Sequence, residues 1–345
     1  MCKERNLFSL GVAVIARNSS ATLRRALESV RPVATQIVVV DTGSTDATPT
    51  IATRMGAEVY FHQWTDDFSA ARNLALAYLR TEWALVLDTD ERLDRESFDQ
   101  YCHLLTDPTV GGVEVCLVSA LGDATYAEHR YTRLFRCHPT IRFEGKVHEQ
   151  IAGSIRAAGY TIVSSDIRIF HDGYREVSLE KIERNIALLE QELAAQPDSV
   201  WHRYHLGLAE FARGNLERAR HLLEPICHSP ELSLEQQELA TIRCAQCALA
   251  SDDLLCAERL LSFTSADRHR EGLRLFVLAG VVAAQHQYHA ASTLLQMAPV
   301  CQSGLVDQEQ RALFAERLVE LAKRRSRPFS PDAWEPTAQW RSVFR

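Results

Sequence analysis

Trp83-Ala-Leu-Val-Leu87, followed directly by Asp88-Thr89-Asp90-Glu91, is the stretch that decides the fold of this chain. The five apolar residues predict a buried strand, and the acidic residues after it place oxygen ligands at the strand's carboxyl end. Open α/β sheets bind their ligands at that edge. Oxygen ligands suit Mg²⁺ or Mn²⁺, ions that commonly link one or two carboxylates to substrate phosphates. Because an Asp-x-Asp pair alone also caps many solvated turns, the interpretation depends on the rest of the chain.

The residues before this stretch alternate between strand and helix patterns. Strands are predicted at 10–16, 36–40 and 58–61, and helices at 23–30, 49–55 and 69–79. Strand–helix–strand units of this length need crossover connections and therefore a parallel sheet. Beyond Asp94 the pattern changes to β-rich pieces at 112–119, 130–136, 142–151 and 166–170. We therefore predict an α/β domain with a mostly parallel, Rossmann-like sheet over residues 1–175.

A repeat of roughly 34 residues replaces the strand patterns from residue 178 onward. Its units are marked by an alanine followed four residues later by a leucine: Ala219 and Leu223, Ala257 and Leu261, Ala291 and Leu295. A two-helix unit of this period needs stacked neighbours to bury its apolar face. The sequence therefore predicts an all-α, tetratricopeptide-like array over residues 176–326, followed by an extended tail at 327–345.

Composition argues against several classes of protein. The 345 residues carry a formal net charge of −7, which disfavours binding to nucleic acid. The apolar stretch 10–16 is too short to span a bilayer and lacks the layout of a signal peptide. Nine cysteines, an odd number, predict free thiols in a reducing compartment, and we interpret Cys244 and Cys247 as helix core packing. We therefore expect a cytoplasmic protein with no membrane span.

Two further polar turns follow predicted strands. Asp41 opens the turn 41–46, where free amides at a helix start favour an anionic or polar ligand, and its carboxylate is placed to accept from a nucleobase imide or ribose hydroxyl. In the segment 66–73, we expect Ser69 to cap a helix with Arg72 in its first turn, where a guanidinium can hold a diphosphate. The alternatives are a simple capped turn at 41–46 and an exposed arginine paired with a neighbouring aspartate.

These motifs, in this order, resemble those of the family-2 glycosyltransferases. The resemblance covers residues 7–175 and rests on Ala16-Arg17-Asn18, Val-Val-Val-Asp41-Thr-Gly-Ser-Thr-Asp46, Trp64-x-Asp-Asp67-Phe-Ser-Ala-Ala-Arg72-Asn73 and Val-Leu-Asp88-Thr-Asp90-Glu91. The helical region is similar to the branch that includes peptide S-glycosyltransferases and relatives of lipopolysaccharide-core glucosyltransferases. The family implies a glycosyltransferase A fold, a nucleotide-diphosphate sugar donor with UDP favoured, Mg²⁺ or Mn²⁺, and inversion at the anomeric carbon.

The resemblance also implies roles for individual residues. In it, Asp41 faces the base, Asp88 lies near the ribose, and the donor site as a whole comprises Ala16, Asn18, Asp41, Asp67, Arg72, Asp88 and Thr89. Asp90 and His171 are assigned to the metal. Downstream, the resemblance makes Glu149 the catalytic base, with Glu144 as the competing candidate, and makes His148 the residue that orients Glu149 or the acceptor.

The sequence therefore predicts a metal-dependent hexosyltransferase that moves a sugar to a peptide, a protein or a cell-envelope glycan. The helical array is expected to hold the acceptor, a partner or a second copy of the chain in a homodimer. Basic residues at 323–327 leave peripheral association with the inner membrane open. The alternative is a binding scaffold, in which the array recruits a protein and the α/β domain is an inactive enzyme.

Overall fold

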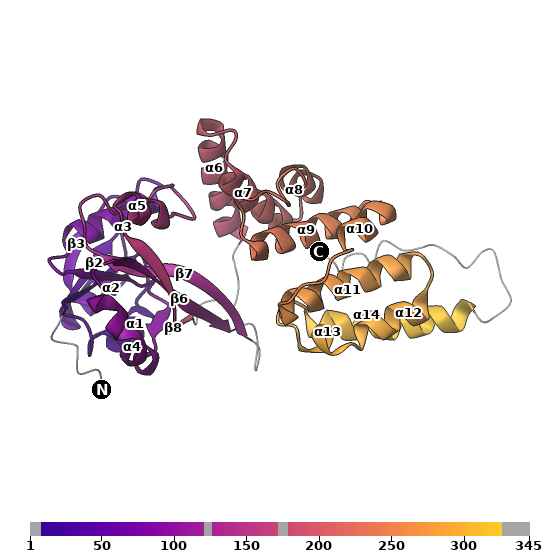
Figure 1. Ribbon diagram of the computed structural model, residues 1–345, viewed down its shortest axis with the longest axis horizontal. Helices are drawn as coiled ribbons and strands as arrows, with labels where there is room; N and C mark the ends of the chain where they lie inside the picture. The colour runs from indigo at the N-terminus through magenta and orange to yellow at the C-terminus, as the bar shows by residue number, and fades with distance from the viewer. Residues whose placement is uncertain (1–7, 121–125, 172–178, 326–345) are drawn as a thin grey trace. The chain divides into compact units, whose positions relative to one another are not determined.

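The computed structural model describes residues 8–120, 126–171 and 179–325, and the chain divides into two compact units, 1–177 and 178–345 (Figure 1). The strands of the first unit are β1 Leu10–Ala16, β2 Gln36–Asp41, β3 Glu58–Phe61, β4 Trp83–Val86, β5 Glu91–Leu93, β6 Val110–Ala120, β7 Tyr126–Arg136 and β8 Thr161–His171. Its helices are α1 Leu23–Val30, α2 Thr48–Arg54, α3 Phe68–Ala77, α4 Arg95–Tyr101 and α5 Ala152–Ala157, with a short 3₁₀ helix at Cys102–Thr106.

One sheet joins all of these strands in the order β3-β2-β1-β4-β7-β6-β8-β5. The strands β1 to β4 run parallel to their neighbours within this group, and β7 then pairs antiparallel with β4. Because the carboxyl ends of β2 and β4 meet at one edge, Asp41 and Asp88 are delivered to the same rim of the sheet.

Apolar side chains cover both faces of this sheet. On one face, the even-numbered residues of β1 pack with α1, whose Leu23, Leu27 and Val30 are buried. On the other face, Ala13 of β1 packs with Val38 and Val40 of β2 and with side chains of α3 and α5. A strand buried on both faces needs a continuous apolar run, and such a run is why the sequence predicts β1 and β2.

The second unit is helical throughout its described residues. Its helices are α6 Leu179–Ala195, α7 Val200–Arg213, α8 Leu216–Leu223, α9 Leu234–Ala250, α10 Leu254–Leu260, α11 Arg268–Ala284, α12 Tyr288–Leu295, α13 Ala298–Gln302 and α14 Gln308–Arg325. The repeat residues Ala219, Ala257 and Ala291 are each 0% exposed and lie in α8, α10 and α12, the second helices of successive pairs. The predicted fold class, a mostly parallel α/β domain followed by an all-α array, is confirmed. The predicted tail lies outside the described residues.

Several predicted local features are wrong. The helix expected from Ser69 begins at Phe68 as α3, and Asp67 caps it by accepting from the Ala70 amide at 2.8 Å. The predicted strand at 142–151 is a loop, closed by two backbone hydrogen bonds of 2.9 Å between Glu144 and Gln150. The sequence analysis also missed β5 and α5, because elements of three and six residues are too short to show a period.

The cysteines behave largely as predicted. Cys244 and Cys247 are buried free thiols in α9, and burial raises the pKa of Cys247 to about 11, so both act as core residues. Cys102 is disulfide-bonded, so the prediction of free thiols is wrong at that position. Within the described ranges, no helix combines the length and the apolar content that crossing a bilayer requires.

The helical unit contains a close backbone contact that can be tested. A Cβ built on Gly272 of α11 would lie 2.2 Å from the carbonyl oxygen of Pro299 in α13. We expect Gly272→Ala to lower the free energy of unfolding by about 1–3 kcal/mol, because backbone atoms would have to move. Urea or thermal unfolding of the full chain measures the change.

Gly153 in α5 is the matched control, because nothing lies within 4 Å of its added Cβ. There, alanine is expected to raise stability by up to about 1 kcal/mol through its higher helix propensity. Equal unfolding curves for the two variants would contradict the close approach of α11 and α13.

Candidate active site

The first predicted donor residues lie where β1 and β2 end. Ala16 and Asp41 are register partners at the last position of the two strands. Asn18 has a left-handed backbone with φ of 49° and joins the two loops that follow. Its backbone amide donates to Ser44 Oγ at 2.9 Å, and its side-chain Oδ1 accepts from the Thr45 amide at 2.8 Å. Asn18 therefore shapes the rim by tying the loop after β1 to the loop after β2.

Asp41 is buried at this rim, and one of its two carboxylate oxygens has no hydrogen-bond partner among the described residues. It is 1% exposed, and its Oδ1 accepts from the backbone amides of Gly43 at 3.0 Å and Ser44 at 2.8 Å. Its Oδ2 is also buried and has no hydrogen-bond partner within the described part of the chain. A buried acceptor without a partner is costly, roughly 1–3 kcal/mol. The arrangement is therefore suited to a ligand that brings a hydrogen-bond donor to Oδ2.

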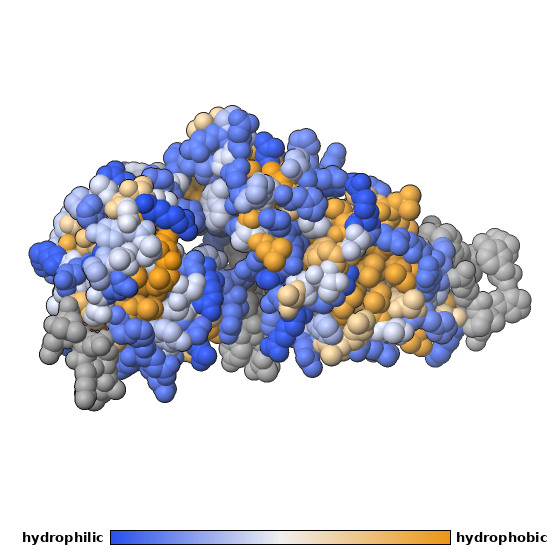
Figure 2. Space-filling model, viewed as in Figure 1, coloured by the Kyte–Doolittle hydropathy of each residue, from blue (hydrophilic) through white to orange (hydrophobic). Residues whose placement is uncertain are grey.

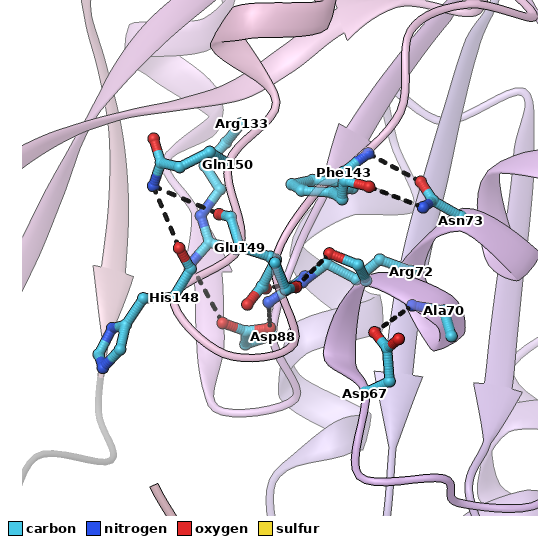
Figure 3. Close-up of polar contacts among 12 residues, drawn as sticks. Asp67, Ala70, Arg72, Asn73, Asp88, Arg133, Phe143, His148, Glu149 and Gln150 are labelled. Atoms are coloured by element: carbon cyan, nitrogen blue, oxygen red, sulfur yellow. Dashed lines mark hydrogen bonds and ion pairs between the residues drawn. The ribbon is translucent and has the colours of Figure 1, made fainter. Parts of the chain in front are cut away.

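Arg72 lies at the centre of a cluster of charged side chains (Figure 3). Its side chain is 7% exposed, its Nε donates to Oε1 of Glu149, and its Nη2 donates to Asp88 Oδ1 at 2.9 Å. The Phe143 ring lies against the guanidinium, and its centroid is 5.6 Å from Arg72 Cζ. Because α3 begins at Phe68, Arg72 opens the second helical turn, so the expected first-turn position is wrong.

Arg133 completes the cluster. The motif Arg133-Leu-Phe-Arg136 resembles the acceptor-side strand of the family, but Arg133 itself had no predicted role at the site. Its Nη2 donates to both Asp88 Oδ2 and Glu91 Oε1 at 3.1 Å. The pairing of β6 with β7 skips a residue at Arg133, and such a bulge re-aims the side chain it carries. A bulge has no sequence signature of its own, so only the structure could identify this residue.

The two arginines control the charge of the acidic residues around them. Burial favours the neutral form of Asp88, but Arg72 and Arg133 outweigh it and hold the pKa of Asp88 well below its usual range. Glu91 is 2% exposed, and burial raises its pKa although Arg133 opposes this. Asp88 is therefore ionised at neutral pH and is held between two cations.

The loop that follows Phe143 is held against the start of α3. The side-chain amide of Asn73 donates to the Phe143 carbonyl at 2.9 Å and accepts from the Phe143 amide at 2.8 Å. The Ser69 hydroxyl donates to the Gly145 carbonyl at 2.6 Å. These contacts place Glu149 against Arg72.

The other two predicted catalytic residues are exposed on this loop. Glu144 takes part in the loop's backbone pairing, and its side chain is exposed. The His148 imidazole is also exposed, and Figure 3 shows it directed away from Arg72 and Asp88. The structure therefore brings Glu149, but not Glu144 or His148, to the charged cluster.

Asp90 and His171 are brought together by the antiparallel pairing of β5 with β8. His171 Nε2 lies 3.3 Å from Asp90 Oδ2, a contact that raises the pKa of His171, and its Nδ1 lies 3.4 Å from Ser119 Oγ. A carboxylate oxygen and an imidazole nitrogen are both groups that ligate divalent cations, and two such groups do not select one ion. No group of three His, Cys, Asp or Glu side chains that could hold a metal ion occurs among the described residues.

Two predicted donor residues make contacts within the protein. Asp67 uses its Oδ1 to cap α3. Thr89 donates its hydroxyl to Ser19 Oγ at 3.0 Å, which ties the acidic turn after β4 to the loop after β1. A cavity of about 450 Å³ is separate from this rim and lies beside Asn73, between α3 and the segment 135–142.

The depressed pKa of Asp88 makes the first unit sensitive to acid. A carboxylate whose pKa is lower in the folded protein than in the unfolded chain stabilises the fold above its unfolded pKa, which is 3.8 for an aspartate. This contribution to the free energy of unfolding is lost as the pH falls below that value. We expect Asp88→Asn to lose less stability than the wild type between pH 5 and about pH 3. Urea unfolding across this range measures the difference, and Asp198→Asn, an exposed site in the helical unit, is the control. Parallel acid curves for wild type and Asp88→Asn would contradict the ion-pair arrangement.

Comparison with known proteins shows what the first unit is similar to. Residues 11–158 match the family described as Glycosyl transferase family 2. A TPR repeat-containing protein of Synechococcus elongatus is 34% identical over 228 residues, which cover 62% of this chain and 55% of that protein. The SPbeta prophage-derived glycosyltransferase SunS of Bacillus subtilis is 28% identical over 194 residues, covering 54% of this chain and 45% of SunS.

The chain thus spans about half the length of these curated relatives. Among solved structures, S. aureus TarS 1-349 in complex with UDP-GlcNAc is 17% identical with a TM-score of 0.40, covering 83% of this chain and 90% of TarS 1-349. The resemblance predicted from the motifs is confirmed for residues 11–158, the part of the chain that matches the Glycosyl transferase family 2 model.

Proposed function

We propose that this chain is an inverting glycosyltransferase that transfers a sugar from a UDP-sugar to a peptide, protein or cell-envelope glycan. The observation that carries the proposal is the buried, unpartnered Oδ2 of Asp41 at the same sheet edge as Asp88 and Asp90, inside a family-2 domain. SunS, with 28% identity, is itself named a glycosyltransferase. The edge offers a hydrogen-bond acceptor for a base and carboxylates for a ribose and a cation.

The donor would lie along this rim. Asp41 would accept from the base, and Asp88, one-third exposed, would accept from a ribose hydroxyl while the arginines hold it ionised. Asp90 and His171 would hold Mg²⁺ or Mn²⁺ beside the diphosphate. When bound, such a cation supplies positive charge against the negative charge that grows on the departing diphosphate.

Glu149 is the proposed base on the acceptor side. Its carboxylate lies beside Arg72 in the same cluster as Asp88, whereas Glu144 is exposed on the outer part of the loop. Glu149 would take the proton from the acceptor as the acceptor attacks the face opposite the leaving diphosphate, a contribution of about 10²–10⁴-fold. Arg72 would position Glu149 through Nε while Nη2 holds Asp88. Its Nη1 is buried with no hydrogen-bond partner among the described residues and would remain available to donate to the diphosphate.

The helical unit is proposed to bind the acceptor, a protein partner or a second copy of the chain. Large apolar side chains are exposed on it, and Figure 2 shows apolar surface over the region of α11 to α14. The most exposed are Leu234, Leu255 and Leu313, at 67%, 83% and 62%. Exposed apolar groups of this kind favour contact with another protein surface.

Removing the metal ligand tests the enzyme assignment. We expect Asp90→Asn to reduce release of UDP from a UDP-sugar by about 100-fold or more, because the leaving diphosphate loses its cation. Released nucleotide is measured with and without Mn²⁺, and Asp198→Asn is the control for charge loss.

Thermal shifts with UDP, GDP and CDP sugars complete the test. If the wild type shows no shift with any donor, the alternative of a scaffold with an inactive domain is supported.

Replacing each candidate base by glutamine tests which of the two takes the proton from the acceptor. Glu149→Gln keeps an oxygen that can accept from Arg72 but removes the basic group, so we expect kcat to fall by about 10²–10⁴-fold with little change in the KM for the donor. Glu144→Gln is the matched control at an exposed position and should leave kcat within about twofold. The reverse result would assign the base to Glu144.

A further inference from the structure

The cavity of about 450 Å³ beside Asn73 has two walls. Asn73 and Leu76 of α3 form one wall together with Leu79, which lies just beyond the end of the helix, and residues 135–142 form the other. Small-molecule sites in proteins usually have volumes of about 300–1,000 Å³. Among the described residues that line the cavity, none is an acidic residue of the rim. The cavity is therefore large enough for a small molecule and is separate from the proposed active site.

The polar side chains of this cavity favour a negatively charged ligand. Arg136, His138 and Arg142 line it, and no Asp or Glu side chain does so among the described residues. The chain as a whole carries a formal net charge of −7, so a cavity with basic groups and no carboxylate runs against its overall charge. Arg142 and His138 are exposed, so a ligand that enters from solvent can reach them. The charges of the cavity therefore complement an anion.

Arg136 is a fixed positive charge in one wall. Its Nε donates to the Val110 carbonyl at 2.7 Å, and its Nη2 donates to the Asp107 carbonyl at 2.9 Å. Its Cζ lies 4.7 Å from the ring centroid of Trp83 and 5.7 Å from that of Tyr160. Carbonyl groups and aromatic rings are uncharged, so they hold the guanidinium in place and leave its positive charge intact. Arg136 therefore attracts an anion without having to be repositioned.

Apolar side chains supply much of the remaining lining. Phe135 and Ile141 are buried, and both belong to the core cluster between the sheet, α3 and α5. Leu76 and Leu79 are partly buried and pack against the same cluster. An inorganic anion would leave these apolar walls in contact with water, and an uncharged apolar molecule would leave the arginines without a counter-charge. A ligand with an apolar body and an anionic head group satisfies both parts of the lining.

We infer that this cavity binds a small organic anion that carries a phosphate or carboxylate head group on an apolar body. The head group would lie against the two arginines, and the body would lie against the two leucines and Phe135. This binding site is additional to the proposed sugar transfer, because none of the proposed donor, metal or base residues is among the described residues that line it.

Asn73 links this cavity to the loop that carries Glu149. Its side-chain amide donates to the Phe143 carbonyl at 2.9 Å and accepts from the Phe143 amide at 2.8 Å. On the opposite wall, Ile141 and Arg142 lead directly into Phe143 along the chain. A molecule held between the two walls would restrain both sides of this contact, so its binding would favour the present position of the loop. The anion is therefore an effector of the loop, and only its consequence for catalysis rests on the proposed function.

Calorimetric titration of the full chain with matched probes tests the ligand class. Octyl phosphate and octanoate carry both an anionic head group and an apolar body, whereas octanol lacks the charge and inorganic phosphate lacks the body. We expect at least one of the octyl anions to bind about 10-fold or more tightly than octanol and inorganic phosphate, and the comparison of the two anions identifies the head group. If neither octyl anion binds, or if octanol binds equally well, the inference is overturned.

Substitutions in the cavity test where the anion binds. Ala77 lines the cavity and is exposed, so Ala77→Trp fills space there without entering the core, and Ala77→Ser is its control. Arg142→Gln removes an exposed cation from the lining, and Arg54→Gln removes an exposed cation elsewhere in the first unit. We expect Ala77→Trp and Arg142→Gln to weaken binding by about 10-fold or more and the controls to leave it within about twofold. Urea unfolding checks that the variants keep wild-type stability, and equal affinity in all of them would contradict this site.

Hydrogen exchange of the loop tests the link to Glu149 without relying on sugar transfer. The backbone amides of Glu144 and Gln150 each donate to the other residue's carbonyl at 2.9 Å. We expect a saturating octyl anion to slow the exchange of these amides at least about threefold in the wild type, because it restrains the loop, and to lose this effect in Arg142→Gln at the same concentration. Unchanged exchange in the wild type with the anion bound would overturn the link between cavity and loop.

These measurements separate the inference from the proposed function. None of them uses a nucleotide or a sugar, so a failure of the octyl anions to bind overturns the inference and leaves the proposed sugar transfer standing. A wild type that binds the anion but turns over no nucleotide-sugar donor has the opposite meaning: the binding site is supported and the proposed function fails.

Discussion

The ion pairs of Arg72 are the interaction on which the rest of the site depends. The buried guanidinium joins α3 to the acidic turn after β4 through Asp88 and to the loop before α5 through Glu149. Removing one member of a buried charge group leaves its partners uncompensated, at a cost of about 3–5 kcal/mol. Arg72 therefore fixes the positions of two carboxylates relative to each other: Asp88, the proposed acceptor for a ribose hydroxyl, and Glu149, the proposed base.

Backbone irregularities at the sheet edge direct the other charged groups. The bulge at Arg133 turns that side chain toward Asp88 and Glu91, and the short strand β5 brings Asp90 to His171 at the end of β8. The left-handed backbone of Asn18 ties together the two loops beside Asp41. Each departs from regular sheet geometry at the rim where the site lies, which is where such departures are commonly found.

The elements that were predictable show either a continuous apolar run or a repeat. The apolar runs of β1, β2 and β4 identify strands covered on both faces, and the alanines of the repeat, which are fully buried, identify the helix pairs. The errors occurred in short or aperiodic segments. The loop at 143–150 contains apolar residues that resemble a strand, but Gly145 and His148 adopt left-handed backbone conformations there. The start of α3 was misplaced because Asp67 and Ser69 are both capable caps.

The sequence by itself determined which residues reach the rim, because Asp41 ends β2 and Asp88 and Asp90 lie in the turn after β4, and the carboxyl ends of these parallel strands must meet. Only the tertiary structure decided which of their atoms are engaged and which are left without a partner. Arg72 and Glu149 are 77 residues apart in the chain, and Asp90 and His171 are 81 residues apart. Contacts over such distances depend on strand order, a bulge and loop closure. Those are set by the packing of the whole domain, whereas strand and helix patterns depend on neighbouring residues alone.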